Sequence, residues 1–191
     1  MLEEIELVNR AKSGDRKALA QLVKNHQQTI YNFSFKICRD REKAENIMQE
    51  TFLSMIKHLN QFDGNSRLST WLYRIVSNHC LMQARKQKDK HFISLNDETD
   101  DDNEFYTDKY IADWSKIPTN VVENEELRQI MDEAIKKLDP DYRIVFLLRD
   151  IEGLSTEETA QATDLSIPAV KSRLHRARAF LRREISKAFS K

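Results

Sequence analysis

The chain has few of the residues that sheet-rich, flexible or disulfide-stabilised proteins need. Its 191 residues include only 3 glycines, 3 prolines and 2 cysteines. So little glycine and proline excludes collagen-like and low-complexity classes, and it disfavours a sheet sandwich, which needs a turn about every ten residues. Cys38 and Cys80 do not make a disulfide framework and lack the spacing of a zinc site. We therefore expect no metal, no cofactor and a reducing, cytoplasmic environment.

Long apolar runs are also missing. No stretch approaches the roughly 18 to 20 apolar residues of a spanning helix. The first 15 residues are acidic and amphipathic, so they do not resemble a secretory signal. Apolar residues make up 40% of the chain and charged residues 32%, which suits a soluble, mostly helical protein. We expect no membrane insertion by the chain itself.

Charge is balanced over the whole chain but divided along it. The 31 basic and 31 acidic residues cancel. The net charge is +6 for residues 1–91, −6 for 92–122, −7 for 123–164 and +7 for 165–191. Two basic regions separated by acidic ones indicate two contacts with a polyanion. Ordinary solvated helix faces are the alternative interpretation.

Residues 1–91 are predicted to form helices. Apolar side chains recur at helical spacing between Leu19 and Ile37, and His26 fills a gap in that stripe. A second helix is expected to start at an Asp40 cap. Its expected apolar stripe consists of Ala44, Ile47, Met48, Phe52, Met55, Ile56 and Leu59. After a turn at 62–66, a third helix is expected to bury Leu68, Trp71, Leu72, Ile75, Val76 and His79.

Helical periodicity stops between residues 92 and 122. Residues 94–103 read SLNDETDDDN, which is too polar and too like-charged to bury a face. This segment is predicted to be an acidic, flexible linker. The pattern on either side predicts an all-α chain, in which two small helical domains (1–91 and 123–191) are joined by that linker.

The last block is predicted to contain four helices. The first runs roughly from Glu123 to Leu138. Asp139 and Pro140 have the order of an N-cap and a first helical residue, and Gly153 is a natural stop for the second helix.

The third and fourth helices are predicted to form a helix-turn-helix. Ser155 and Glu158 have capping-box spacing before a short helix that ends near Thr163. A tight turn at 164–166 leads to a long basic helix through Lys187, the arrangement of helix-turn-helix proteins. Ala160 is the small residue expected where the two helices cross. Val170 and Leu174 are expected to face inward.

The exposed residues of the long helix suit the major groove of DNA. The first turn of such a helix reaches base edges, and the remaining cations contact phosphates. The predicted duplex-binding residues are Ser155, Thr156, Pro168, Ala169, Lys171, Ser172, Arg173, Arg176 and Arg178. Pro168, Ala169, Lys171 and Ser172 are assigned to base edges, and the three arginines mainly to phosphates. A basic amphipathic helix on a membrane or a partner protein is the alternative.

A second constellation lies on the third helix of the first block. Aromatic rings, an amide and cations together are typical of surfaces that hold an unpaired strand. The predicted residues are Asp63, Asn65, Ser66, Arg67, Trp71, Arg74, Asn78, Arg85 and Lys86. Trp71 also falls on the apolar stripe, so a core position for this ring is an open alternative.

Three ordered motifs resemble the extracytoplasmic-function (group IV) class of bacterial sigma factors, in the sigma-70 family. Residues 43–52 (KAENIMQETF) resemble the core-polymerase-binding helix, and residues 62–78 (FDGNSRLSTWLYRIVSN) resemble the segment that melts and reads the −10 element. Residues 138–149, 153–160 and 170–178 resemble the domain that reads the −35 element. Asn46 stands where the family usually has Asp, and Asp164 where it often has Gly.

The resemblance implies a function for each segment. A sigma factor is not an enzyme; it joins core RNA polymerase (its beta′ and beta subunits) and directs it to promoter DNA. The helix meeting polymerase would use Glu45, Asn46, Gln49, Glu50 and Phe52. An anti-sigma factor is an expected partner. The acidic linker would either thread the RNA-exit path or act only as a tether.

Other function classes are kept open at this point. An ordinary DNA-binding regulator would use only the helix-turn-helix and would not bind core polymerase stoichiometrically. An enzyme is disfavoured because the sequence shows no paired carboxylates in a glycine-rich site, no phosphate-cradling loop and no nucleophile–base spacing. Cys38 and Cys80 are considered as a redox-sensitive pair, which the expected reducing environment disfavours.

Overall fold

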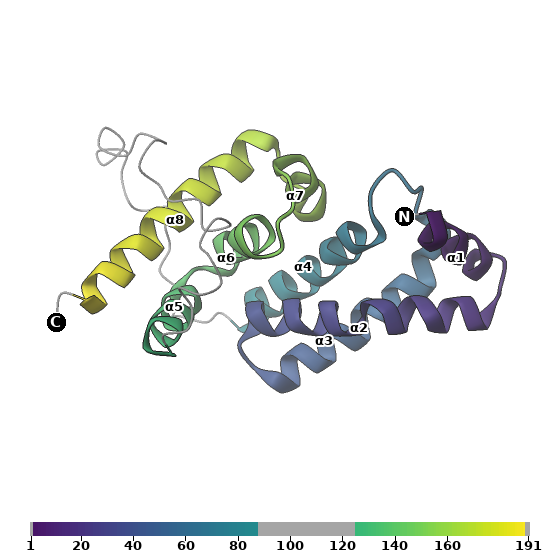
Figure 1. Ribbon diagram of the computed structural model, residues 1–191, viewed down its shortest axis with the longest axis horizontal. Coiled ribbons are helices and arrows are strands. Elements are labelled where there is room, and N and C mark those ends of the chain that lie inside the picture. Colours follow the sequence, from purple (N-terminus) through teal and green to yellow (C-terminus); the bar gives the residue numbers. More distant parts are fainter. Residues whose placement is uncertain (1, 88–124, 190–191) are drawn as a thin grey trace. The chain divides into compact units, whose positions relative to one another are not determined.

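The computed structural model describes residues 2–87 and 125–189, and within these ranges all the regular elements are helices (Figure 1). The all-α prediction is confirmed for this part of the chain. The predicted linker, 92–122, lies outside the described residues. The contacts of the backbone divide the chain into two compact units, one made of residues 1–86 with 160–164 and the other of residues 87–159 with 165–191.

The first unit is a bundle of four α-helices with one short 3₁₀ turn. Asp15 caps the second helix by accepting hydrogen bonds from the backbone N–H groups of Lys17 (2.9 Å) and Ala18 (3.1 Å). Asp40 caps the third helix as predicted, accepting from the N–H of Lys43 at 3.0 Å. The elements are α1 (Leu2–Lys12), α2 (Arg16–Cys38), α3 (Arg41–His58), η1 (Leu59–Gln61) and α4 (Leu68–Gln87).

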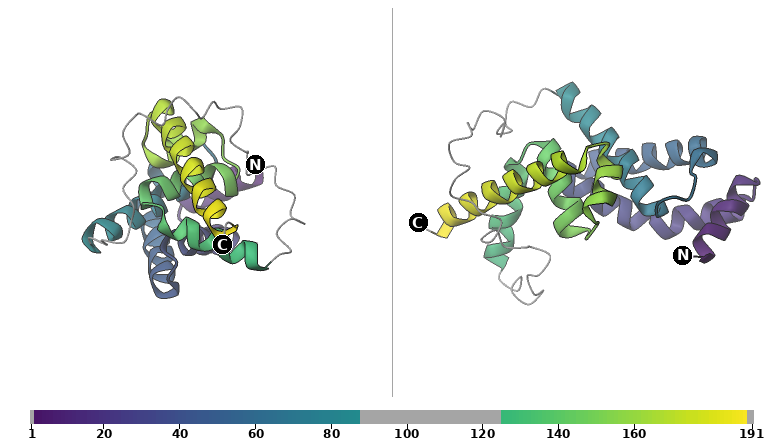
Figure 2. Two further views of the ribbon diagram at one scale, coloured as in Figure 1. Left: turned by 90° about the vertical axis from the view of Figure 1, so that its left-hand side faces the viewer. Right: turned by 90° about the horizontal axis from the view of Figure 1, so that it is seen from above.

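The core of this unit follows most of the predicted stripes. Helix α2 packs against both α1 and α3, as the views of Figure 2 show. Leu22, Ile30 and Phe33 on α2 are fully buried, and His26 accompanies them half-buried, with Nε2 2.9 Å from a carboxylate oxygen of Glu4. The predicted stripe of α3 is wrong at Ile56, which is 48% exposed.

After the predicted linker the chain forms the four α-helices that the sequence predicts, most of whose residues belong to the second unit. Asp139 accepts a hydrogen bond from the N–H of Asp141 at 2.9 Å and Pro140 is the first helical residue, so the predicted cap is confirmed. The long helix packs on the two helices that open the unit. The elements are α5 (Glu125–Lys137), α6 (Pro140–Phe146), η6 (Leu147–Ile151), α7 (Thr156–Thr163) and α8 (Ile167–Phe189).

The end of α6 widens into a π-helical turn, η6, which the sequence did not predict. The N–H of Glu152 donates to the carbonyl of Leu147 (2.8 Å) and the N–H of Leu154 to that of Leu148 (2.9 Å). These bonds reach one or two residues further back than α-helical bonds do. Gly153, at φ 72°, then ends the helix, as predicted.

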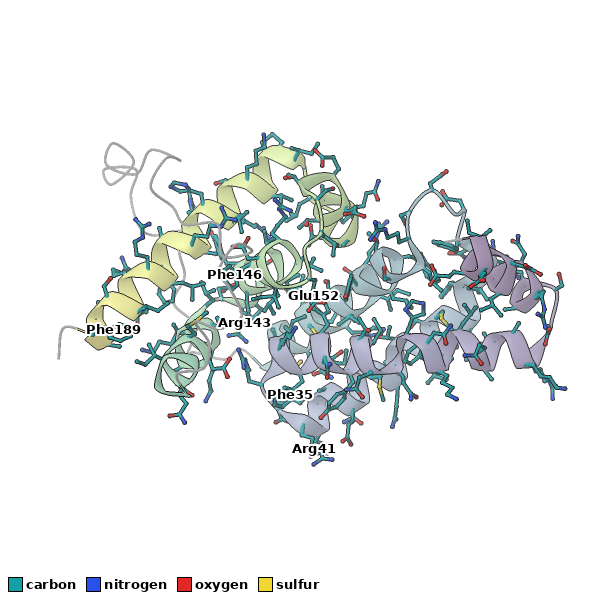
Figure 3. The ribbon with its side chains drawn as sticks, in the orientation of Figure 1. Phe35, Arg41, Arg143, Phe146, Glu152 and Phe189 are labelled. Carbon is teal, nitrogen blue, oxygen red and sulfur yellow. The ribbon has the colours of Figure 1, made fainter. Side chains whose placement is uncertain are left out.

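A buried arginine closes the neighbouring helix end. Arg143 is 3% exposed, and its guanidinium donates to the carbonyls of Lys136 and Leu138. These carbonyls lie at the C-terminal end of α5, where a helix lacks its own donors. Arg143 and the fully buried Phe146 are both labelled beside α6 in Figure 3. The arginine therefore serves the packing of α5 on α6.

Candidate nucleic-acid interface

Helix α8 has one buried face and one cationic face. Val170, Leu174, Ala177 and Phe180 recur every three or four residues and are buried, which confirms the inward face predicted from Val170 and Leu174. Lys171, Ser172 and Arg176 lie on the exposed side. The face that points away from the unit's core is therefore positive, as binding to phosphates requires.

Arg178 does not lie on that cationic face. Its guanidinium makes two hydrogen bonds, of 2.8 and 2.7 Å, to the carboxylate of Asp150. The Arg178 side chain is 15% exposed and that of Asp150 1%. A two-point ion pair at this depth fixes α8 to the π-helical turn η6. The phosphate role predicted for Arg178 conflicts with this placement, since the side chain is committed to a partner inside the unit.

Arg173 has an intermediate position. Nη1 lies 2.9 Å from Oδ1 of Asp141, with side-chain exposures of 31% and 37%. The guanidinium also lies over the ring of Tyr142, 5.9 Å from its centroid. Because this pair is partly solvated, Arg173 is held near the surface without being buried.

The start of α8 and the start of α7 present polar and apolar groups to solvent. Pro168 is exposed, Ala169 is half-buried, and the exposed Ile167 precedes them. At α7, Ser155 and Glu158 form the predicted capping box: Ser155 N–H donates to Glu158 at 2.8 Å, and Glu158 N–H donates to the Ser155 hydroxyl at 3.0 Å.

The turn between α7 and α8 is built without glycine. Asp164 has φ 57°, in the left-handed region that Asp tolerates better than most residues. Thr156, half-buried, follows the Ser155 cap, and Ala160 is half-buried while Ala162 is fully buried. The helix-turn-helix predicted from the sequence is thus present, and Ala162 is the more deeply packed small residue of α7.

The loop before α4 is a compact turn held by Asp63. Its carboxylate accepts hydrogen bonds from the backbone N–H of Asn65 (3.0 Å) and from the Asn65 side-chain amide (2.6 Å). The backbone hydrogen bond from Asn65 lowers the pKa of Asp63. Gly64 supplies the positive φ, 78°, that this turn needs. Asp63, Asn65 and Arg67 are exposed and Ser66 is half-buried.

The predicted strand-binding residues of α4 share one face. Trp71, Arg74 and Asn78 are three and four residues apart, so they lie on successive turns. Arg74 and Asn78 are exposed, while Trp71 is half-buried with its ring 5.5 Å from the centroid of Phe62. Trp71 therefore combines packing with partial exposure. For Arg85 and Lys86 the structure describes the backbone only, so their predicted role is not tested.

Helix α3 presents a polar face opposite its buried one. Asn46, Gln49 and Glu50 are exposed, and the half-buried Glu45 accepts a hydrogen bond from Arg41 at 3.1 Å. Arg41 projects from the start of α3 in Figure 3. Phe52, which the sequence assigned to the same contact, is 8% exposed and belongs to the core.

Two apolar side chains on α3 were missed by the sequence reasoning. Leu53 and Ile56 are 51% and 48% exposed, and they continue the line of Gln49 and Glu50 at helical spacing. Apolar side chains adjoining a polar exposed face are typical of a protein-binding surface. The sequence did contain a signal for Leu53. It comes four residues after Gln49, so helical spacing places it on the polar face and away from the buried Ile47.

Comparison with known proteins gives the family. The Sigma-70 region 2 family matches residues 22–90 and the Sigma-70 region 4 family matches residues 128–181. The chain is 30% identical to ECF RNA polymerase sigma factor SigW of Bacillus subtilis (strain 168) over 178 residues, which cover 93% of this chain and 94% of that protein. The chain belongs to the extracytoplasmic-function (ECF) sigma factor family. It is accordingly a non-catalytic initiation factor that binds core RNA polymerase and directs it to promoter DNA.

Further similarities agree with this assignment. The ECF sigma factor is 32% identical to the ECF RNA polymerase sigma-E factor of Escherichia coli (strain K12) over 176 residues, 90% of this chain and 88% of that protein. Its fold resembles that of CnrH in complex with the cytosolic domain of CnrY (TM-score 0.65, 24% identity, 95% and 96% coverage). It also resembles the sigma factor RpoE in complex with the anti-sigma factor NepR from Bartonella quintana (TM-score 0.64, 24% identity, 89% and 98% coverage).

None of the described helices is both long and apolar enough to cross a membrane. Within residues 2–87 and 125–189, His, Cys, Asp and Glu do not gather in groups of three that would hold a metal ion.

Proposed function

We propose that the ECF sigma factor divides initiation among three helix faces. The exposed face of α3 binds core polymerase, the Asp63–Arg67 loop and the Trp71–Asn78 face of α4 hold the melted strand, and the cationic face of α8 reads duplex DNA. The supporting observation is that the polar residues of each set lie on a face turned away from the core of their own unit. An exposed face is what a macromolecular partner needs.

The duplex contact is expected to use Lys171 and Arg176 as phosphate ligands, with Ser172, Pro168 and Ala169 nearest to base edges. This moves Lys171 from the base-edge role that the sequence assigned to it. Both cations are exposed on α8. Arg173 contributes less because Asp141 shares its charge. Arg178 is expected to support DNA binding indirectly, because its ion pair with Asp150 holds α8 in position.

The strand contact is expected to depend on Asn78. Extruding a base costs a few kcal/mol, which contacts in the protein must offset. An exposed amide such as that of Asn78 offers both a donor and an acceptor to the pairing edge of a base. Trp71 offers part of its ring for stacking, which is worth about 1–3 kcal/mol per base in proteins that bind single strands.

Run-off transcription tests the division of roles. Core RNA polymerase with this chain should give RNA from a defined start on cognate promoter DNA. The Asn78→Ala variant should lower the yield on fully paired DNA and regain most of it on a template mismatched over the −10 element. Asn9→Ala, an exposed amide on α1, is the matched control. Equal yields from Asn78→Ala and wild type on paired DNA would remove Asn78 from the strand contact.

A salt titration tests the duplex contact. Arg176→Ala should flatten the log–log salt dependence of duplex binding by about 0.9, and Arg176→Ala with Lys171→Ala by about 1.8, because each phosphate contact releases counterions. The measurement is fluorescence anisotropy with labelled −35 duplex at several salt concentrations. Lys24→Ala removes one exposed positive charge from α2 and should leave the slope unchanged. An unchanged slope for the double variant would place both cations away from phosphate.

The protein is expected to act in the cytoplasm, where core polymerase and promoter DNA are found. An anti-sigma factor is expected to hold it inactive, a suggestion supported by the similar folds of CnrH and RpoE, which were solved with CnrY and with the anti-sigma factor NepR.

A further inference from the structure

The two cysteines of the chain lie against each other. Cys38 is the last residue of α2, and Cys80 lies in the C-terminal half of α4, 42 residues later. Their sulfur atoms are 3.8 Å apart. Both side chains are thiols in this structure. As the sequence contains no other cysteine, an oxidised chain has only these two sulfurs to join.

The approach of the two sulfurs is fixed by helix packing. Five residues before Cys38, Phe33 meets Tyr73 of α4 edge to face, with ring centroids 4.6 Å apart. Phe33 is fully buried, and Tyr73 is 4% exposed. Along both helices, the contact between Phe33 and Tyr73 comes before the contact between Cys38 and Cys80. The two helices therefore run parallel here. The buried Phe33–Tyr73 contact therefore holds α2 beside α4 close to the thiols.

The two thiols differ in access to solvent. Cys80 is 3% exposed, whereas Cys38, at the end of its helix, is half-buried. An oxidant dissolved in water therefore reaches Cys38 first. Cys80 lies behind it, close enough to attack the sulfur once that sulfur has been oxidised.

We propose that Cys38 and Cys80 form a reversible intramolecular disulfide when the protein meets a peroxide. The thiolate of Cys38 attacks one peroxide oxygen, which breaks the O–O bond and gives a sulfenic acid and one water. The thiolate of Cys80 then attacks the Cys38 sulfur, so that the S–S bond forms, the S–O bond breaks and a second water leaves. Two thiols lose two electrons and two protons in total, and hydrogen peroxide accepts both.

Formation of the bond needs a small movement. The sulfurs must close from 3.8 Å to about 2.0 Å, a change that side-chain rotation and a slight shift of a helix end supply. The disulfide joins the end of α2 to α4 and closes a long loop, which restricts the unfolded chain and stabilises the first unit. A dithiol returns the pair to its reduced state by exchange. This chemistry is independent of the proposed contacts with DNA and polymerase.

Mass spectrometry with thermal unfolding tests the proposal. The full chain, treated with a small excess of hydrogen peroxide, should lose about 2 Da, consume both thiols and yield one cross-linked peptide pair that contains Cys38 and Cys80. Its first unfolding transition should rise by at least about 5 °C and return after dithiothreitol.

Two variants separate the disulfide from other oxidation. Cys38→Ser, at the half-buried position, should remain folded, show no mass loss and show no rise in the transition. Cys80→Ala should stop Cys38 at an oxygenated product, seen as added mass. A wild-type chain that gains oxygen at Cys38 while Cys80 stays a thiol, that forms disulfide-linked dimers, or that remains unmodified would overturn the proposal.

Discussion

Asp150→Ala is expected to destabilise the second unit by about 3–5 kcal/mol, because it removes the carboxylate that accepts two hydrogen bonds from the buried guanidinium of Arg178. The Asp150 side chain is 1% exposed and that of Arg178 15%, and the two share hydrogen bonds of 2.7 and 2.8 Å. The loss should appear as faster hydrogen exchange in peptides from α6 and α8 of the full chain. A urea titration followed by circular dichroism gives the size of the loss.

A second ion pair of the same unit provides the control. Asp141→Ala breaks the pair with Arg173, whose side chains are 31% and 37% exposed, and should cost about 1 kcal/mol or less because water already screens it. Replacing both partners of the buried pair, as Asp150→Leu with Arg178→Met, should recover most of the lost stability. Equal losses from Asp150→Ala and Asp141→Ala would show that burial does not govern the effect.

Leu53→Glu is expected to weaken binding to core polymerase by about 30-fold or more, the effect of removing an interface residue worth at least about 2 kcal/mol. Leu53 is 51% exposed on the α3 face that carries Gln49 and Glu50, so the new carboxylate remains in water when the protein is free. The melting temperature should therefore hardly change. Affinity is measured by competition with a labelled sigma factor for purified core enzyme.

The control for this prediction is another exposed apolar residue. Ile5, on α1, is 42% exposed, and Ile5→Glu makes a similar change outside α3. It should change the affinity by less than about 3-fold, as expected for a position outside the central contacts. Ile56→Glu, on the α3 face, should behave like Leu53→Glu. If all three variants bind core enzyme equally, the polymerase contact does not involve this face.

Local signals in the sequence predicted the local structure well. The caps at Asp40 and Asp139 and the box formed by Ser155 and Glu158 each depend on residues two or three positions apart, and the structure contains all of them. The buried positions of α2 and α8 follow from helical spacing in the same way. Family resemblance then gave the function, which composition and charge alone left open between several classes.

Features that depend on tertiary partners were not predictable. Arg178 looks like any other cation of a basic helix until Asp150, 28 residues earlier, is seen beside it. Phe52 and Ile56 fall at the edges of an apolar stripe, and only packing decides which of the two faces solvent. The distance between Cys38 and Cys80 likewise depends on how α2 meets α4.

Because of the π-helical turn at Leu147–Ile151, the number of residues before Asp150 matters as much as which residues they are. Each residue of an α-helix advances the chain by about 100° around the axis, so a wide turn acts as a one-residue insertion. A chain one residue shorter before Asp150 would form an uninterrupted α-helix, and the carboxylate would point about 100° away from its present direction. Deleting one residue between Leu147 and Asp150 would therefore separate Asp150 from Arg178 and remove the ion pair that holds α8.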